Sequence, residues 1–407
     1  MKEQGGKATS KPLKNWMEAF SLLRDKIQSS RAKKKVIFLD ELSWMAASKN
    51  ALLTALEYFW NSWASGRKDV VLVVSASSTS WMLNKVVHDK GGLYNRLTRR
   101  IWLRPFSLRE CMEMAAKRKL AMTKTDVLKA YMAFGGVPYY WTLLEPGRSV
   151  AQNIDRLCFS ESGQLKNEYD YLFSSLFARP EPYVAIVSVL AKKKQGLSLG
   201  EIAEMGSIGI GGKLSQRLKE LSACGFIREY RPYGKKKKDS LFQLIDPFTL
   251  FYFRFMENPP TDEHFIEHNI MGSKLKTWLG LSFELVCLLH VPQLKAGLGV
   301  SGVATNACCW RCEEDEDLGV SGHQIDLLID RADGVINLCE MRYATSPYAI
   351  SKGDKEDWAS RVDDFLKITK AKSSIQVTLV TPYGAKENAH RWAATNVLDL
   401  DILFNAS

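Results

Sequence analysis

The 407-residue sequence lacks the features that direct a chain into or across a membrane. No apolar run reaches about 18 residues, the length that marks a candidate membrane-spanning helix. Residues 1–10 are polar and lack the apolar core of a signal peptide. The eight cysteines are scattered, which is more typical of reduced thiols than of a disulfide framework. We therefore expect a cytoplasmic protein with no membrane partner.

The sequence also has few residues with the spacing of a structural metal site. It contains one C-x-x-C pair, Cys309 and Cys312, with Cys308 beside it. A structural zinc site takes two such pairs or a pair of histidines, and the candidate partners His290 and His323 are distant in sequence. We interpret these cysteines as thiols in a loop and expect no structural zinc.

A third missing feature is the loop G-x-x-x-x-G-K-[ST], whose backbone N–H groups and lysine cradle the phosphates of a nucleotide. The nearest candidate, the segment 5–9 with sequence GGKAT, lacks the first glycine at the required spacing. It also has Ala8 where a serine or threonine should follow the lysine, and no strand precedes it. We interpret it as part of a flexible terminus. Mg²⁺ without such a loop gives weak nucleotide affinity.

Positive charge is abundant and locally concentrated. The formal charge is +11, and basic runs occupy residues 31–35 and 235–238. Such a balance favours polyanionic partners, chiefly nucleic acid. The length fits two or three domains, and the composition is that of a globular protein.

The segment 36–45 (VIFLDELSWM) carries the acidic half of a nucleotide site. Four apolar residues predict a strand buried on both faces, as in parallel sheets. Asp40 and Glu41 follow at its carboxyl end, where open α/β sheets bind ligands. We expect Asp40 to hold Mg²⁺ and Glu41 to orient or deprotonate water, unless both are simply solvated acids. A second strand, 70–74, ends in hydroxyl residues, of which Ser75 and Ser77 are placed to sense a γ-phosphate.

A basic segment and a helical region follow. Arg96, Arg99 and Arg100 either stabilise phosphoryl transfer or form a basic face for nucleic acid, and the sequence leaves both roles open. Residues 101–104 are expected to form a short strand. The pattern over residues 108–176 is helical and is interrupted by a turn at residues 135–138 (GGVP).

Residues 181–256 are predicted to form three helices and a basic hairpin, the layout of a winged helix-turn-helix. One face of the third helix presents Lys213, Gln216 and Arg217, at the spacing of a helix that enters a major groove. The hairpin tip holds Lys235, Lys236, Lys237 and Lys238, which are suited to phosphate contacts. A role in protein assembly alone is the alternative.

The last third of the chain contains a predicted hairpin of strands 323–330 and 335–343. A three-residue loop with Gly334 left-handed would pair Arg331 with Val335 and place Asp326 opposite Glu340. Two such carboxylates form a metal site, and Arg342 lies on the face of Glu340. A solvated hairpin face is the alternative. A helix over 358–368 and strands over 375–381 and 398–403 complete the region.

The order of these segments resembles a known family. The sequences VIFLDELSWM, VVSASSTSWM, GGLYNRLTRRIWLRPFSL, FGGVPYYW, IGGKLSQRLKELSACGFI and GHQIDLLIDRADGVINLCEMRYA look like those of prokaryotic AAA-type ATPases of the STAND group. The resemblance implies ATP and Mg²⁺ as ligands, DNA as a partner and possible homo-oligomers. By position, Asp40 matches the Walker B aspartate and Glu41 the glutamate that follows it. Ser77 lies near the sensor position, and Arg96, Arg99 and Arg100 near the arginines after it. Glu284, Asp326, Glu340 and Arg342 match an endonuclease-like pattern of a helix acid, D and E-x-K.

The resemblance therefore implies an α/β fold in four parts. These are a partial parallel-sheet P-loop ATPase core (1–107), a helical lid (108–178), a winged helix-turn-helix (181–256) and a restriction-endonuclease-like α/β domain (261–407).

Three departures from the family pattern shape the expected function. The Walker A loop is missing, so the chain resembles a truncated member; Ala76 stands where relatives have glycine; and Arg342 replaces a lysine. We expect an ATP-binding, DNA-associated protein of the ATPase family in which hydrolysis is lost or weak. A non-enzymatic winged-helix module and a metal-dependent nuclease are the alternatives.

Overall fold

The structure is a computed structural model that describes residues 12–46, 51–77, 79–82 and 96–406. The chain divides into two compact units, residues 1–102 and 103–407. Among the described residues, no single helix has the length and apolar character needed to cross a membrane, although a bent pair, 273–289 with 291–297, passes that test of length and composition together.

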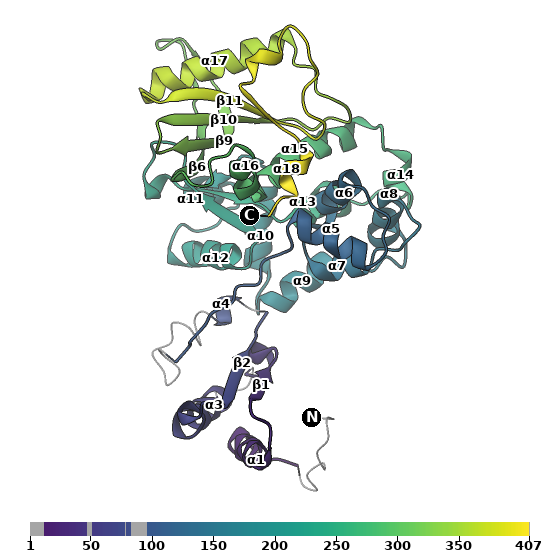
Figure 1. Ribbon diagram of the computed structural model, residues 1–407, viewed down its shortest axis with the longest axis vertical. Coiled ribbons are helices and arrows are strands. Elements are labelled where there is room, and N and C mark those ends of the chain that lie inside the picture. The colour runs from purple at the N-terminus through teal and green to yellow at the C-terminus, as the bar shows by residue number, and fades with distance from the viewer. Residues whose placement is uncertain (1–11, 47–50, 78, 83–95, 407) are drawn as a thin grey trace. The chain divides into compact units, whose positions relative to one another are not determined.

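The first unit has a small α/β core (Figure 1). Its elements are α1 (Trp16–Ser29), β1 (Lys35–Leu39), α2 (Leu42–Met45), α3 (Ala51–Ser62), the short 3₁₀ turn η1 (Ala64–Gly66), β2 (Val70–Val74) and α4 (Thr79–Met82). The two strands are parallel, with Lys35 opposite Val70 and Leu39 opposite Val74. The predicted parallel pairing is therefore confirmed, and it brings the carboxyl ends of β1 and β2 to one edge.

Among the described residues of this unit, the helices cover one face of the two-stranded sheet. Ile37 and Val70 pack with Phe20 of α1 and Phe59 of α3 into one apolar cluster. On the other face, Phe38 keeps 58% of its surface exposed. The prediction of a strand buried on both faces is therefore wrong, because α1 and α3 both pack on the same side. The predicted strand over residues 101–104 is also absent, and those residues are exposed.

The second unit begins with helices. They are α5 (Leu108–Lys117), α6 (Lys124–Phe134), α7 (Pro138–Thr142), α8 (Val150–Ile154), the π-helical turn η3 (Asp155–Phe159) and α9 (Glu168–Leu176). Gly135 ends α6 with a φ of 62°, and Pro138 begins α7, so the predicted turn is confirmed. Ser107 and Thr123 start α5 and α6 with capping boxes, which satisfy the first backbone N–H groups of each helix.

Residues 181–256 contain the expected three helices and strand pair. The elements are α10 (Glu181–Ala191), β3 (Leu197–Ser198), α11 (Leu199–Met205), α12 (Gly212–Ala223), β4 (Ile227–Tyr230), the 3₁₀ turn η4 (Lys237–Asp239), β5 (Leu241–Leu244), α13 (Pro247–Phe251) and the π-helical turn η5 (Tyr252–Met256). The strands form an antiparallel sheet in the order β3-β5-β4. Leu214, Leu218 and Leu221 bury one face of α12, which leaves the other face to polar residues.

The C-terminal part is built on a five-stranded sheet. Its elements are α14 (Phe265–His268), α15 (Ser273–Leu289), α16 (Val291–Gly297), β6 (Thr305–Arg311), β7 (Glu314–Asp315), β8 (Val320–Ser321), β9 (Gln324–Arg331), β10 (Val335–Met341), α17 (Lys352–Thr369), β11 (Ser374–Val380), the 3₁₀ turn η6 (Arg391–Ala393), β12 (Asn396–Leu398) and α18 (Leu400–Leu403). The strand order is β12-β11-β10-β9-β6. The pairs β10–β11 and β11–β12 are parallel, whereas β9 is antiparallel to both neighbours. The predicted last strand is too long, because residues 400–403 form α18.

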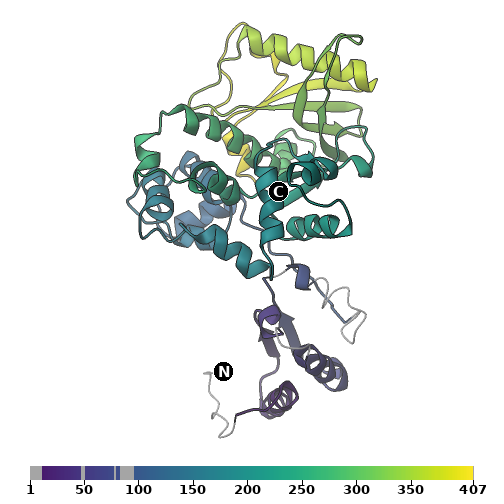
Figure 2. The same cartoon turned by 180° about the vertical axis from the view of Figure 1, so that it is seen from behind.

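Helices cover both faces of this sheet, as Figures 1 and 2 show. Phe365 of α17 packs with Leu328 and Leu338 on one face. Phe283 of α15 belongs to a larger cluster with Leu327 and Cys339. That larger cluster includes residues from α5 to α18, so it joins the helical part of the second unit to one face of the C-terminal sheet.

Candidate functional site

The carboxyl ends of β1 and β2 bring two acids and two hydroxyls together. Ser75 Oγ donates a hydrogen bond to Asp40 Oδ1 at 2.5 Å and accepts one from the Glu41 N–H at 3.1 Å. Glu41 has a φ of 52° and precedes α2. Its Oε2 accepts from both the N–H and the Oγ of Ser77, at 3.2 and 2.8 Å. The structure thus places Ser75 and Ser77 beside the acids, as the parallel pairing predicts.

This edge fits a hydrated magnesium ion. Asp40 is exposed and Glu41 is half-buried. Within the described part of the chain, Asp40 Oδ2 and Glu41 Oε1 accept no hydrogen bond, so each carboxylate offers a second oxygen. Mg²⁺ usually keeps several waters and binds through one or two carboxylates. Asp40 and Glu41 would hold such an ion, which would neutralise phosphate charge.

The three arginines of the basic segment do not contact Asp40 or Glu41 in the described part of the chain. Arg96, Arg99 and Arg100 are exposed and lie outside helices and strands. Among the residues that the structure describes, no hydrogen bond or ion pair joins them to Asp40 or Glu41. Their predicted role in phosphoryl transfer stays a prediction, and so does their alternative role as a basic face.

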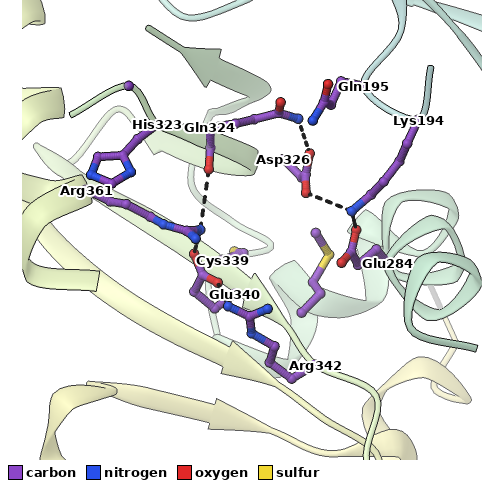
Figure 3. Close-up of a pocket in the computed structure, with 12 residues that line it drawn as sticks. Lys194, Gln195, Glu284, His323, Gln324, Asp326, Cys339, Glu340, Arg342 and Arg361 are labelled. Atoms are coloured by element: carbon purple, nitrogen blue, oxygen red, sulfur yellow. Dashed lines mark hydrogen bonds and ion pairs between the residues drawn. The ribbon is translucent and has the colours of Figure 1, made fainter. Parts of the chain in front are cut away.

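A second site lies in the C-terminal part. A cavity of about 280 Å³ is lined by Glu284, Asp326, Glu340 and Arg342, all four of the residues expected of an endonuclease-like pattern (Figure 3). Strand β9 pairs with β10 in the predicted register, with Ile336 opposite Asp330 and Cys339 opposite Leu327. The next pair in this register is Glu340 with Asp326. Helix α15 contributes Glu284.

Burial sets the electrostatics of this cavity. Glu340 is 5% exposed, and burial raises its pKa, while Arg361 and Arg342 act in the opposite direction. Burial likewise raises the pKa of Glu284, and Lys194 opposes that shift. A buried carboxylate is costly without a partner, so the cations beside these acids matter.

Glu340 has two guanidinium partners. Arg361 Nη1 donates to Glu340 Oε1 at 2.8 Å, and Arg342 Nη2 donates to Glu340 Oε2 at 3.3 Å. Arg361 also forms an ion pair with Asp357 one turn away on α17, at 2.8 Å. Sequence reasoning missed Arg361, because an arginine on an amphipathic helix carries no distinctive signal.

Lys194 is the second residue that sequence reasoning missed. It lies in the turn between α10 and β3, and its Nζ forms an ion pair with Glu284 and lies 3.5 Å from Asp326 Oδ2. Gln324 Nε2 donates to Asp326 Oδ1 at 2.5 Å. Figure 3 shows the ammonium of Lys194 pointing between the two acids.

The expected metal pair Asp326–Glu340 does not fit this arrangement. Both oxygens of Glu340 are engaged by guanidinium groups, and arginine does not release its charge by deprotonation. A metal ion at Glu340 would have to displace two fixed cations. Glu284 and Asp326 differ from Glu340 in their partner, because the cation that these two acids share is the single ammonium of Lys194.

The basic residues of the 181–256 segment are accessible. Lys213, Gln216 and the four lysines 235–238 are exposed, and Arg217 is half-buried. Gln216 is partly engaged, since its Nε2 donates to Glu220 Oε1 at 2.9 Å. The base of the hairpin is fixed, because the Tyr233 N–H donates to Cys309 O at 2.7 Å and its ring meets that of Phe365.

The remaining candidate metal ligands lie elsewhere. Cys308 and Cys309 are buried on β6, and burial raises the pKa of Cys309 to about 11. Among the described residues, the one group of three side chains with metal-ligand spacing is Asp155, His264 and Glu267, which the sequence analysis did not single out. Asp155 accepts the N–H groups of Ile266 and Glu267 at 2.9 and 3.0 Å, so it stabilises the start of α14.

Comparison with known proteins finds a family match for the N-terminal part. Residues 1–144 match a family described as an ATPase domain predominantly from Archaea. This match supports an ATPase-type protein, with the nucleotide and Mg²⁺ that such a class uses.

Two particular proteins are similar to the chain. The uncharacterized protein MJECL04 of Methanocaldococcus jannaschii is 25% identical over 279 residues, which are 67% of this chain and 58% of that protein. The chain thus spans well under two thirds of that relative's length. The Walker-type ATPase PABY2304 of Pyrococcus abyssi aligns with a TM-score of 0.40 and 15% identity, over 58% of this chain and 67% of that one.

Proposed function

We propose that this chain is a DNA-associated ATPase-family protein that binds Mg²⁺–nucleotide through Asp40 and Glu41. The observation that carries the proposal is the hydrogen-bonded group of Asp40, Glu41, Ser75 and Ser77 at the carboxyl ends of two parallel strands. Ligands bind at this edge in open α/β sheets, and the match of residues 1–144 to an ATPase family supports the same assignment.

The two acids have different roles in the proposed chemistry. Asp40, oriented by Ser75, holds the hydrated magnesium ion, and Glu41, oriented by Ser77, faces the attacking water. Because this chain contains no G-x-x-x-x-G-K-[ST] motif, we propose that turnover is weak relative to binding.

Calorimetric titration with Mg²⁺–ATP tests the nucleotide site. We expect the wild-type chain to bind and Asp40→Asn to lose most of that affinity. Asp25→Asn is the matched control, because Asp25 is an exposed acid on α1 of the same unit. Release of phosphate, measured in parallel, reports turnover. Absence of binding by the wild-type chain would remove nucleotide from the proposal and leave a non-enzymatic DNA-binding or assembly module.

The DNA partner is proposed from the 181–256 segment. The order α10-β3-α11-α12-β4-β5 is that of a winged helix-turn-helix, in which α12 stands in the place of the recognition helix. Lys213 and Arg217 on α12 and the lysines 235–238 on the hairpin supply positive charge for phosphates.

A second candidate function is hydrolysis of a phosphodiester in the C-terminal cavity. The observation that favours it is the convergence of Glu284, Asp326, Glu340 and Arg342 on one cavity. Moreover, the side chains of Arg342 and Arg361 keep 35% and 21% of their surface exposed, so both guanidinium groups are accessible to phosphate oxygens. Cleavage of plasmid DNA by the wild type but not by Asp326→Ala, with Mg²⁺ or Mn²⁺, would support it. Equal cleavage by both, or none, would exclude it.

A further inference from the structure

The backbone of Lys194 and the side chain of Lys194 contact different parts of the chain. Its backbone carbonyl accepts a hydrogen bond from Gln243 Nε2 of β5 at 2.7 Å, and Gln243 Oε1 accepts from Arg228 Nε of β4 at 2.7 Å. Next to it, the Gln195 carbonyl accepts from the hydroxyl of Tyr230. The turn that carries Lys194 is therefore held by the strands of the 181–256 segment, while its ammonium reaches acids of the C-terminal part.

The charges in the cavity are balanced in two separate groups. Arg342 and Arg361 both engage Glu340. Among the described residues, Lys194 is the one cation that forms ion pairs with Glu284 and Asp326, and the neutral side chain of Gln324 also donates to Asp326. These two groups differ in kind, because arginine forms a rigid, permanently charged fork, whereas lysine presents a compact ammonium on a flexible stem.

An ammonium between two carboxylates occupies the place of a small cation. The side chain of Glu284 is 15% exposed and that of Asp326 25% exposed, so both acids are shielded from bulk solvent but open to the cavity. A hard divalent cation prefers carboxylate oxygens and carries twice the charge of an ammonium. The Lys194 side chain is 34% exposed, and its stem leads outward to a surface turn, so the ammonium has room to leave.

We propose that Lys194 acts as an intramolecular competitor for a divalent cation at Glu284 and Asp326, so that ammonium and metal exclude each other. This inference rests on the second candidate function for its purpose, but it concerns binding and not cleavage. The 181–256 segment thereby controls access of a cation to the C-terminal cavity, since its strands hold the Lys194 turn.

Titration of the full-length chain with Mn²⁺ alone tests the competition. We expect Lys194→Met, which keeps the apolar stem and removes the charge, to bind Mn²⁺ at least tenfold more tightly than the wild type. Lys193→Met is the matched control, because Lys193 is the exposed neighbour in the same turn, and it should bind as the wild type does. The double variant Lys194→Met/Asp326→Asn should lose the gain. Equal or weaker binding by Lys194→Met would overturn the proposal.

A measurement on the wild-type chain avoids any folding defect of the variant. Acetic anhydride labels free amines, so Mn²⁺ should increase labelling of Lys194 severalfold and leave Lys193 unchanged, as read by peptide mass. Unchanged Lys194 labelling at saturating Mn²⁺ would also overturn the proposal. If Lys194→Met gains Mn²⁺ affinity but no variant cleaves DNA, the cation site stands and the second candidate function alone fails.

Discussion

Arg361 Nη1 donates a hydrogen bond to Glu340 Oε1 at 2.8 Å, across the gap between α17 and β10. This hydrogen bond joins the helix on one face of the C-terminal sheet to the acid at the end of its central hairpin. Together with Arg342, it makes Glu340 part of a charge-balanced group and removes it from the residues that are available to a metal ion.

Loss of Arg361 should destabilise the second unit. Arg361→Met leaves the buried Glu340 with one weaker partner, which costs roughly 1–3 kcal/mol of unfolding free energy. Urea denaturation measures this loss. Arg109→Met is the control, because Arg109 pairs with Glu113 on an exposed helix surface, where ion pairs contribute little. The cost should shrink in a Glu340→Gln background. Equal effects of Arg361→Met and Arg109→Met would contradict the assigned role.

His290 should make stability depend on pH. The Leu108 N–H donates to its Nε2 at 3.0 Å and its Nδ1 lies 2.8 Å from Val286 O, so the ring is neutral in this arrangement. Burial lowers the pKa of His290 in the folded chain. The unfolded chain therefore binds the proton more readily, and stability falls as the pH drops below about 6.5.

Denaturation between pH 7 and pH 5.5 tests this dependence. The wild type should lose stability more steeply than His290→Gln, by at most about 1.4 kcal/mol per pH unit. Other titrating groups are common to both proteins and cancel in the difference. Parallel pH profiles would show that His290 does not contribute.

Gly136 should tolerate no side chain. A Cβ at this position would lie 1.9 Å from the Phe106 carbonyl oxygen, a backbone atom that cannot rotate away. The Phe106 N–H also donates to Gly136 O at 2.7 Å, which holds the two segments together. We expect Gly136→Ala to cost about 3 kcal/mol. Gly209→Ala serves as the control, because no atom lies within 4 Å of its Cβ, and its thermal midpoint should barely change.

The lysines of the hairpin should govern sequence-independent DNA affinity. Lys235→Ala/Lys238→Ala should weaken binding to a mixed-sequence duplex and reduce the slope of log Kd against log salt by about 0.9 for each DNA phosphate that is no longer neutralised. Lys352→Ala/Lys355→Ala, two lysines in the first turn of α17, is the charge-matched control. Unchanged affinity and slope in the hairpin variant would favour an assembly role for the segment instead.

Much of the local structure could be predicted from sequence. Helix–strand alternation predicts the parallel pairing of β1 and β2, because a crossover helix between two apolar runs favours parallel strands. The register of β9 and β10 follows from the loop at residues 332–334, where Gly334 has a φ of 82°. The same reasoning failed to predict the burial of β1, because periodicity does not reveal on which side of the sheet the helices pack. Both helices pack on one side, and Phe38 on the other side is exposed.

The sequence by itself determined where the acids stand. Asp40 and Glu41 follow a strand, and Asp326 and Glu340 face each other across a hairpin, because backbone periodicity and turn geometry are local properties. The tertiary structure alone decided which charges meet those acids. Lys194 and Arg361 reach the cavity from a separate segment and from a crossing helix. Nothing local encodes these pairings, because they arise only when buried carboxylates must find cations as the apolar core closes.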